Sequence, residues 1–102
     1  MNDLPVLVSK PLAQIITFWR PGSFEWSWEE EYADIFARPE TEQIEALVDT
    51  YGIGFLDRVA PILLSNNGRV WDGHHRICIA IKRGIPSLKV ELVEPKDENV
   101  EQ

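Results

Sequence analysis

The spacing of apolar residues along the chain predicts two amphipathic helices. In residues 41–51, apolar side chains recur at the i, i+3, i+4 and i+7 positions that form one face of a helix, and Gly52 suits the position after its last turn. A second run with this spacing starts at Trp28 and is stopped by Pro39. Residues 27–30 just before it have the pattern of a capping box, which satisfies backbone N–H groups at the start of a helix.

Other segments are predicted as strands. Residues 4–9 are rich in strand-forming side chains, and residues 88–92 alternate between apolar and charged ones. Residues 60–64 and 69–71 flank the sequence Ser-Asn-Asn-Gly, whose Asn-Gly pair favours a type I′ turn, so they predict a β-hairpin. The apolar residues 12–19 fit either an extension of the first strand or a short helix.

Residues 77–83 predict a helix that follows the hairpin. Lys82 and Arg83 suit the negative end of the helix dipole, and Gly84 suits the position after it. Alternating isoleucines in this run also fit a strand, but these end signals favour the helix, in which Cys78 is a core residue and not a nucleophile.

Composition predicts one folded domain. The chain has 102 residues, of which 44% are hydrophobic, and four are tryptophans. No apolar stretch approaches the length of a membrane span, and the first residues lack the pattern of a signal peptide, so we expect a cytoplasmic protein. The single cysteine, which cannot form an internal disulfide, agrees with a reducing compartment.

The formal net charge of −7 is distributed unevenly. Residues 1–57 carry three basic and eleven acidic side chains (net −8), residues 58–90 carry six and one (net +5), and residues 91–102 carry one and five (net −4). The overall negative charge argues against tight binding to DNA irrespective of its sequence, because phosphate contacts dominate that affinity. The basic middle segment still favours a smaller anionic ligand.

That basic segment contains the most distinctive motif, Trp71-Asp72-Gly73-His74-His75-Arg76, at the turn between the hairpin and the following helix. The first turn of a helix has backbone N–H groups without intrahelical partners and is a natural anion site. Gly73 permits close approach of a ligand, the two histidines are hydrogen-bond donors, and Arg76 has a planar fork suited to phosphate. The motif therefore predicts phosphate binding by residues 73–76.

Alternative roles remain open for these residues. Asp72 would repel an anion unless it caps the helix, binds a metal or acts as a base. One histidine of the pair could pack into the core or bond a nearby carbonyl while its neighbour faces solvent, because adjacent helical residues point about 100° apart. A structural zinc site is disfavoured by the single cysteine and the adjacent histidines.

The tryptophans at positions 19, 26 and 28 also have two interpretations. Large aromatic side chains commonly anchor a small core, which is the interpretation we favour. The alternative is an exposed surface around Trp26 and Trp28 that stacks on a base or docks a partner protein.

The order of elements and the motif resemble the ParB/sulfiredoxin superfamily, mainly over residues 41–93. Residues 4–16 match its opening strand region, and residues 18–40 are expected to be a lineage-specific insertion. The resemblance implies an α+β fold, with a mixed β-sheet packed with helices and a strand-turn-helix elbow that binds phosphate. A single domain is expected over residues 1–93, followed by a frayed acidic tail at 94–102. Short versions of this domain occur in phages and plasmids, so the resemblance implies that the protein is located in the cytoplasm of a host cell.

In that family the elbow binds nucleotide phosphates, and members include CTP-dependent DNA partition proteins, ATP-using reductases, reported nucleases and a free-serine kinase. Where sulfiredoxins have their catalytic cysteine this chain has His74, which argues against sulfinic acid reduction. The resemblance implies that Gly73, His74, His75 and Arg76 hold a nucleotide (ATP, ADP or CTP) or a nucleic-acid phosphate. Such a protein would be a phage or plasmid accessory protein in DNA metabolism or host regulation.

Two other functions are kept beside phosphate binding. One is a magnesium-dependent phosphotransferase or a nuclease, with Asp72, His74 and His75 as catalytic residues and Asp72 as the metal ligand; a second acid is expected at Glu25 or Glu29. The other is an interaction module without catalysis, which docks a host protein through its acidic, tryptophan-rich first half.

Overall fold

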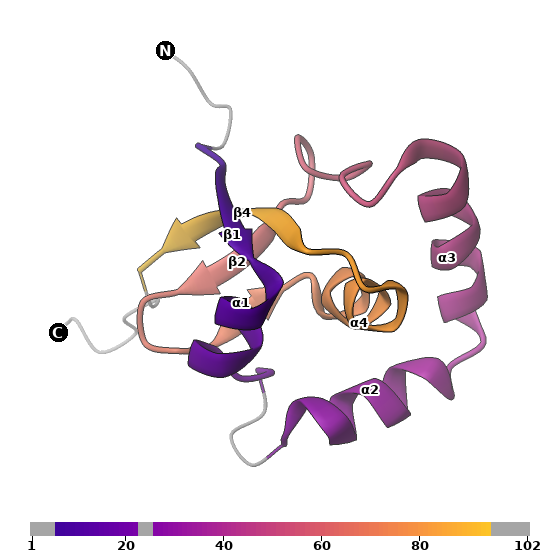
Figure 1. The fold of residues 1–102 in the computed structure, drawn as a ribbon, viewed down its shortest axis with the longest axis horizontal. Helices are drawn as coiled ribbons and strands as arrows, with labels where there is room; N and C mark the ends of the chain where they lie inside the picture. The colour runs from indigo at the N-terminus through magenta and orange to yellow at the C-terminus, as the bar shows by residue number, and fades with distance from the viewer. Residues whose placement is uncertain (1–5, 23–25, 95–102) are drawn as a thin grey trace, which may run out of the picture.

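The computed structural model describes residues 6–22 and 26–94, which form four helices around a four-stranded mixed sheet (Figure 1). This confirms the predicted α+β class. In chain order the elements are β1 (Val8–Pro11), α1 (Leu12–Phe18), α2 (Trp28–Phe36), α3 (Glu40–Tyr51), β2 (Ile62–Ser65), β3 (Val70–Asp72), α4 (His74–Arg83) and β4 (Ser87–Val93).

The sheet has the strand order β1-β4-β2-β3, so the last strand in sequence lies in its interior. β4 is antiparallel to β1 and parallel to β2, and Val90 lies opposite both Val8 and Ile62. β2 and β3 form the antiparallel hairpin that the sequence predicts. The parallel β2–β4 pair needs a crossover, and α4 supplies it.

α4 is the central helix of the fold. It lies between the sheet and the pair α2 and α3 and contacts both of those helices as well as α1 (Figure 1). Ile77 and Ala80 of α4 pack with Leu64 of β2 and Val90 of β4 in one buried cluster. A helix covered on this many sides must be apolar over much of its circumference, which explains the run Ile-Cys-Ile-Ala-Ile.

Several local predictions are confirmed. The capping box forms at α2, since the Ser27 side chain accepts the Glu30 N–H and the Glu30 side chain accepts the Ser27 N–H. Gly52 and Gly84 follow α3 and α4 with positive φ angles of 93° and 68°. Residues 12–19, for which strand and helix were both open, form helix α1 as far as Phe18.

The type I′ turn was a wrong prediction. Within the described residues only glycines have positive φ, so Asn67 lacks the left-handed conformation that this turn requires. Gly68 alone adopts it, at φ +87°, and its N–H donates to the Ser65 carbonyl at 3.0 Å. The Asn67 side chain instead accepts the Arg69 N–H at 3.2 Å, so it stabilises a three-residue loop.

Two of the tryptophans belong to the core, as the sequence favoured. Trp19 and Trp28 pack against the buried cluster, and both indole N–H groups donate at 2.7 Å to backbone carbonyls, of Ser65 and Trp19 respectively. Trp26 is half-buried. Docking of a partner protein through Trp26 and Trp28 stays a prediction.

Two predicted segments lie partly outside the residues that the structure describes. Residues 4–5 of the first predicted strand and residues 95–102 of the predicted acidic tail lie outside the described residues. In the described ranges, no helix combines the length and the apolar character needed to cross a membrane.

Candidate phosphate-binding site

The motif forms the predicted elbow between β3, which ends at Asp72, and α4, which begins at His74. Gly73 lies between them as the N-cap residue with φ +103°. A Cβ atom at Gly73 would lie 2.7 Å from Cγ1 of the buried Ile62. Both the left-handed backbone and this close packing require glycine here.

Asp72 is not the N-cap, which corrects one of its open interpretations. It precedes the cap by one residue, and its Oδ1 accepts the N–H of Gly73 at 2.9 Å. Among the described residues, no side chain caps the first turn of α4. The N–H groups of His74, His75 and Arg76 therefore have no capping acceptor in this part of the chain.

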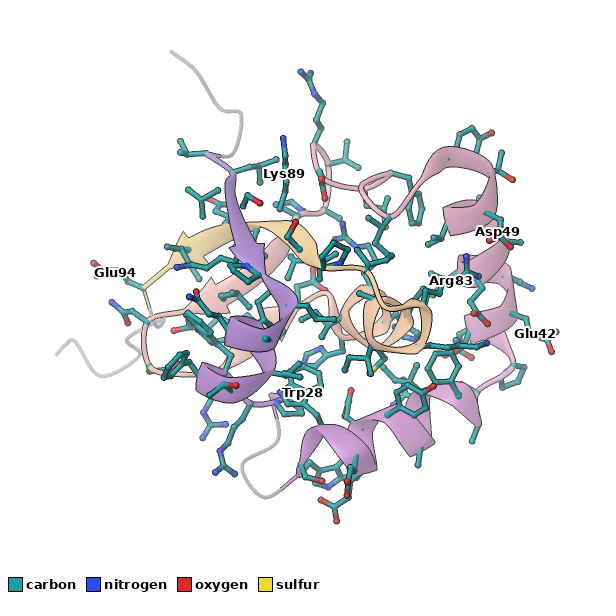
Figure 2. The ribbon with its side chains drawn as sticks, viewed as in Figure 1. Trp28, Glu42, Asp49, Arg83, Lys89 and Glu94 are labelled. Carbon is teal, nitrogen blue, oxygen red and sulfur yellow. The ribbon has the colours of Figure 1, made fainter. Side chains whose placement is uncertain are left out.

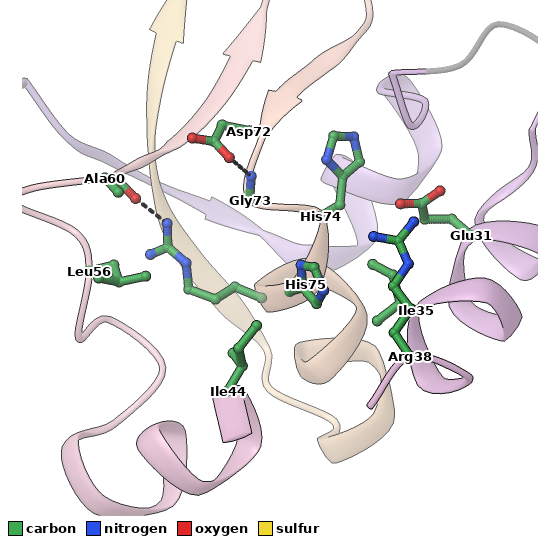
Figure 3. A pocket seen from close by; sticks show the side chains of 11 residues that line it. Glu31, Ile35, Arg38, Ile44, Leu56, Ala60, Asp72, Gly73, His74 and His75 are labelled. Carbon is green, nitrogen blue, oxygen red and sulfur yellow. Dashed lines mark hydrogen bonds between the residues drawn. The ribbon is translucent and has the colours of Figure 1, made fainter. Parts of the chain in front are cut away.

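A cavity of about 390 Å³ opens in front of this first turn (Figure 3). Residues 72–76 of the elbow form one side of it. The other sides come from Glu31 and Ile35 of α2, Arg38 of the turn after α2, Ile44 of α3, and Leu56 and Ala60 of the loop before β2. The positive end of a helix thus faces a space with both polar and apolar walls, which suits an anionic organic ligand.

His74 is bound to the protein's own backbone. Its Nε2 accepts the Gly22 N–H at 3.0 Å, and its ring lies 6.4 Å from that of Trp28. Burial lowers the pKa of His74, with smaller opposing effects from Glu31 and Asp72. His74 is therefore a neutral side chain whose ring holds the backbone at Gly22. Its predicted catalytic and ligand-binding roles stay predictions.

His75 differs from its neighbour. Its Nε2 atom is buried and has no hydrogen-bond partner within the described part of the chain, and the residue lines the cavity. A buried polar atom of this kind normally contacts water, an ion or a ligand. His75 is therefore the histidine of the pair that is better placed to contact a ligand.

Arg76 is buried, with 3% of its surface exposed. Its guanidinium donates to Asp57 Oδ1 at 3.0 Å and to the Ala60 carbonyl, so it ties the loop before β2 to the start of α4. Burial lowers the pKa of Arg76, and the Asp57 carboxylate opposes that effect. The sequence predicted this fork as a phosphate ligand, but two of its nitrogens already have protein acceptors.

Sequence reasoning missed two charged residues of the cavity, Glu31 of α2 and Arg38 in the turn after it. Arg38 donates through Nε and Nη2 to Asp34 Oδ2, at 3.1 and 2.5 Å. In the sequence this pair has the i, i+4 spacing of an ordinary solvated helix surface, so no local signal marked it.

The acid on the cavity wall is not one of the two that were predicted. Glu25 lies outside the described residues, and Glu29 lines a different, apolar cavity with Trp28 and Tyr32. Residues two apart on a helix point about 200° away from each other, so Glu31 faces the elbow and Glu29 does not.

A metal at Asp72 stays a prediction. Within residues 6–22 and 26–94, no three histidine, cysteine, aspartate or glutamate side chains gather closely enough to hold a metal ion by themselves. Magnesium usually takes one or two carboxylates and completes its shell with phosphate oxygens and water, and Asp72 and Glu31 both line the cavity.

Much of the basic charge of residues 58–90 is paired within the protein. Lys82 and Arg83, at the far end of α4, pair with Glu45 at 2.9 and 3.2 Å, and Arg83 also pairs with Asp49 of α3. Figure 2 shows Arg83 and Asp49 directed toward each other. An anionic ligand at the elbow would therefore depend on the helix start and the cavity wall, and less on the net charge of the segment.

Comparison with solved structures identifies a similar fold. The chain matches the structure described as the C2221 form of a Pnob8-like ParB-N domain with a TM-score of 0.56, over 96% of this chain and 34% of that chain, at 15% sequence identity. The chain has a ParB-like fold. This confirms the fold that the sequence resemblance implied.

The similarity has clear bounds. This chain spans about a third of the length of the solved chain it matches, and at 15% identity the match concerns the fold alone. No protein-family model matches the sequence, and the comparison with curated proteins found no match. The function must therefore be argued from the site.

Proposed function

We propose that this ParB-like domain binds a nucleotide through its phosphates at the start of α4. The observation that carries the proposal is the cavity of about 390 Å³ in front of a helix start that no described side chain caps. Backbone N–H groups and a partial charge of about +0.5 at a helix N-terminus favour phosphate without any basic side chain.

The walls of the cavity favour a nucleotide over a nucleic-acid phosphate. Its volume lies in the range typical of small-molecule sites, about 300–1,000 Å³. Ile35, Ile44 and Leu56 offer apolar contacts for a base or sugar, while the elbow offers polar ones. A contact with a nucleic-acid backbone would need a more open basic surface than this.

Magnesium fits this proposal through Asp72. Its Oδ1 accepts the Gly73 N–H, and its carboxylate lines the same cavity as the helix start. Asp72 would hold the magnesium ion, whose positive charge would offset the repulsion between this carboxylate and the phosphates. The variant Asp72→Asn should then bind nucleotide with a weaker dependence on magnesium.

Calorimetric titration with ATP, ADP and CTP, each with and without magnesium, tests the proposal. We expect binding of at least one nucleotide, weakened in His75→Ala and unchanged in Lys82→Gln, a control at the opposite end of α4. Single-stranded and duplex oligonucleotides are titrated in parallel. If only oligonucleotides bind, the ligand of the site is a nucleic-acid phosphate and not a free nucleotide. If none of these ligands produces heat, phosphate binding is refuted.

The two carboxylates of the cavity favour a second candidate, a magnesium-dependent phosphotransferase or nuclease. Asp72 and Glu31 come from different elements and line the same space, where their carboxylates could hold magnesium for phosphoryl transfer. Assays of ATP turnover, serine phosphorylation and DNA cleavage test this function, and any turnover found should be abolished in Asp72→Ala. Unchanged turnover in that variant would remove Asp72 from the mechanism.

The resemblance suggests where such a domain would work. We place it among phage or plasmid accessory proteins that act in the cytoplasm of a host cell, on DNA metabolism or on a host regulator. Nucleotide binding would give such a protein a way to respond to the state of the cell.

A further inference from the structure

The cavity has a wall of mixed charge opposite the helix start. Glu31 of α2 and Arg38 of the turn between α2 and α3 line it, and Figure 3 shows both on the side that faces His74 and His75. Asp34 of α2 accepts two hydrogen bonds from Arg38. Without Arg38, the charged lining residue of this wall would be the carboxylate of Glu31.

Arg38 and Arg76 are the two arginines that line the cavity, and they differ in how firmly they are held. The Arg76 side chain is 4% exposed and bound to Asp57 and the Ala60 carbonyl. The Arg38 side chain is 46% exposed, and its partner Asp34 is 37% exposed. Exposed i, i+4 ion pairs contribute little to stability, so Arg38 can exchange Asp34 for another anion at small cost.

A second anchor at this position changes which ligand the site prefers. The amides of α4 can hold one phosphate group, and Arg38 lies on a different element across the same cavity. A ligand with one phosphate can satisfy the helix start alone, whereas a chain of phosphates can extend from it to the guanidinium. His75 lines the same cavity, and its buried Nε2 lacks a hydrogen-bond partner among the described residues.

We propose that Arg38 is a specificity-determining residue that binds the distal phosphate of a nucleoside di- or triphosphate and is held by Asp34 until the ligand arrives. This inference rests on the proposed function, because it assumes a nucleotide with a phosphate at the start of α4. The preference for the longer phosphate chain would then come from the turn between α2 and α3, which lies outside the sequence motif 72–76.

Titrations of ATP, ADP and AMP, or of the cytidine series if CTP is the nucleotide that binds, test the role of Arg38. The wild-type protein should bind the triphosphate more tightly than the monophosphate. Arg38→Gln should weaken triphosphate binding about 10- to 100-fold, the range expected for a charged hydrogen bond, and should leave monophosphate binding nearly unchanged. Arg38→Lys should restore part of the affinity, because it keeps the charge but not the fork.

Asp34→Asn separates this role from a structural one. It releases Arg38 and removes a nearby negative charge, so triphosphate binding should tighten by up to about fivefold, the value of a typical exposed ion pair. Arg83→Gln is the matched control, because it removes the same charge from the far end of α4, where Arg83 pairs with Asp49. It should leave all affinities unchanged, and circular dichroism checks that every variant is folded.

The outcomes distinguish the two proposals. If the wild-type protein binds no nucleotide, the proposed function fails and this inference fails with it. If the wild-type protein binds nucleotide but shows no preference for the triphosphate, or if Arg38→Gln weakens mono- and triphosphate equally, only the role of Arg38 is refuted.

Discussion

Replacing Gly73 by alanine should destabilise the fold for two separable reasons. The φ angle of +103° places a new Cβ in the left-handed region, which costs roughly 1–2 kcal/mol for a residue with a side chain. That Cβ would also lie 2.7 Å from Ile62 Cγ1 and 3.0 Å from Ile62 Cβ and Cγ2. Ile62 is 1% exposed and cannot move away freely, so overpacking adds roughly 1–3 kcal/mol.

The net effect is smaller than these two costs together. Alanine also restricts the unfolded chain, which returns about 0.4–1 kcal/mol. We therefore expect Gly73→Ala to lower the free energy of unfolding by about 1–4 kcal/mol. Gly84→Ala is the matched control, because Gly84 also has a positive φ, +68°, and a Cβ atom added there would approach no neighbouring group of the described residues within 4 Å. The difference between the two variants isolates the clash, about 1–3 kcal/mol.

Urea unfolding followed by tryptophan fluorescence measures the free energy of unfolding of both variants, since Trp19 and Trp28 pack against the core. A second measurement repeats Gly73→Ala in an Ile62→Ala background, where two of the three clashing atoms are gone and the cost should fall. If Gly73→Ala and Gly84→Ala are equally destabilising, or if the Ile62 background makes no difference, the packing argument for glycine at the elbow is wrong.

Three further predictions concern the side chains around the elbow. Asp57→Ala should lower the free energy of unfolding by about 3 kcal/mol in urea titrations, because it leaves the Arg76 guanidinium buried with the Ala60 carbonyl as its remaining acceptor; a loss below about 1 kcal/mol would contradict this. Thermal stability should be highest above pH 6.5 and should fall as the pH drops through the lowered pKa of His74, because the unfolded chain takes up the proton first. His74→Gln should flatten that pH profile, and a profile unchanged by this substitution would assign the dependence elsewhere. Cys78, whose pKa burial raises to about 12, should be inert to a thiol reagent at pH 8 in the folded protein and should react on unfolding; rapid reaction of the folded protein would show that the side chain is accessible.

Local patterns in the sequence were enough to predict most of the elements. The helical spacing in residues 41–51 appears as α3, and the capping box of residues 27–30 appears at α2. The alternation in residues 88–92 appears as β4, with Leu88 and Val90 buried. These features depend on side chains within about four residues of one another, so short stretches of the sequence are enough to predict them.

The hairpin turn shows how a local rule can fail. Asn-Gly permits a type I′ turn, but it does not require one. Ser65 Oγ accepts the Asn67 N–H at 3.3 Å, and Asn67 Oδ1 accepts the Arg69 N–H, which stabilises a different loop in which only Gly68 is left-handed. The side-chain hydrogen bonds of Ser65 and Asn67 therefore favour this loop over the type I′ turn.

The motif 72–76 identified the elbow from the sequence, because a glycine between a strand and a helix is a local requirement. What each of its side chains does was decided by residues far away in sequence. Arg76 binds Asp57, His74 accepts a hydrogen bond from Gly22 across 52 positions, and the cavity wall comes from α2. Periodicity and spacing in the sequence determine which side chains share a face of a helix or strand. Only tertiary packing determines which of these faces contact each other, and therefore which charged side chains line this cavity.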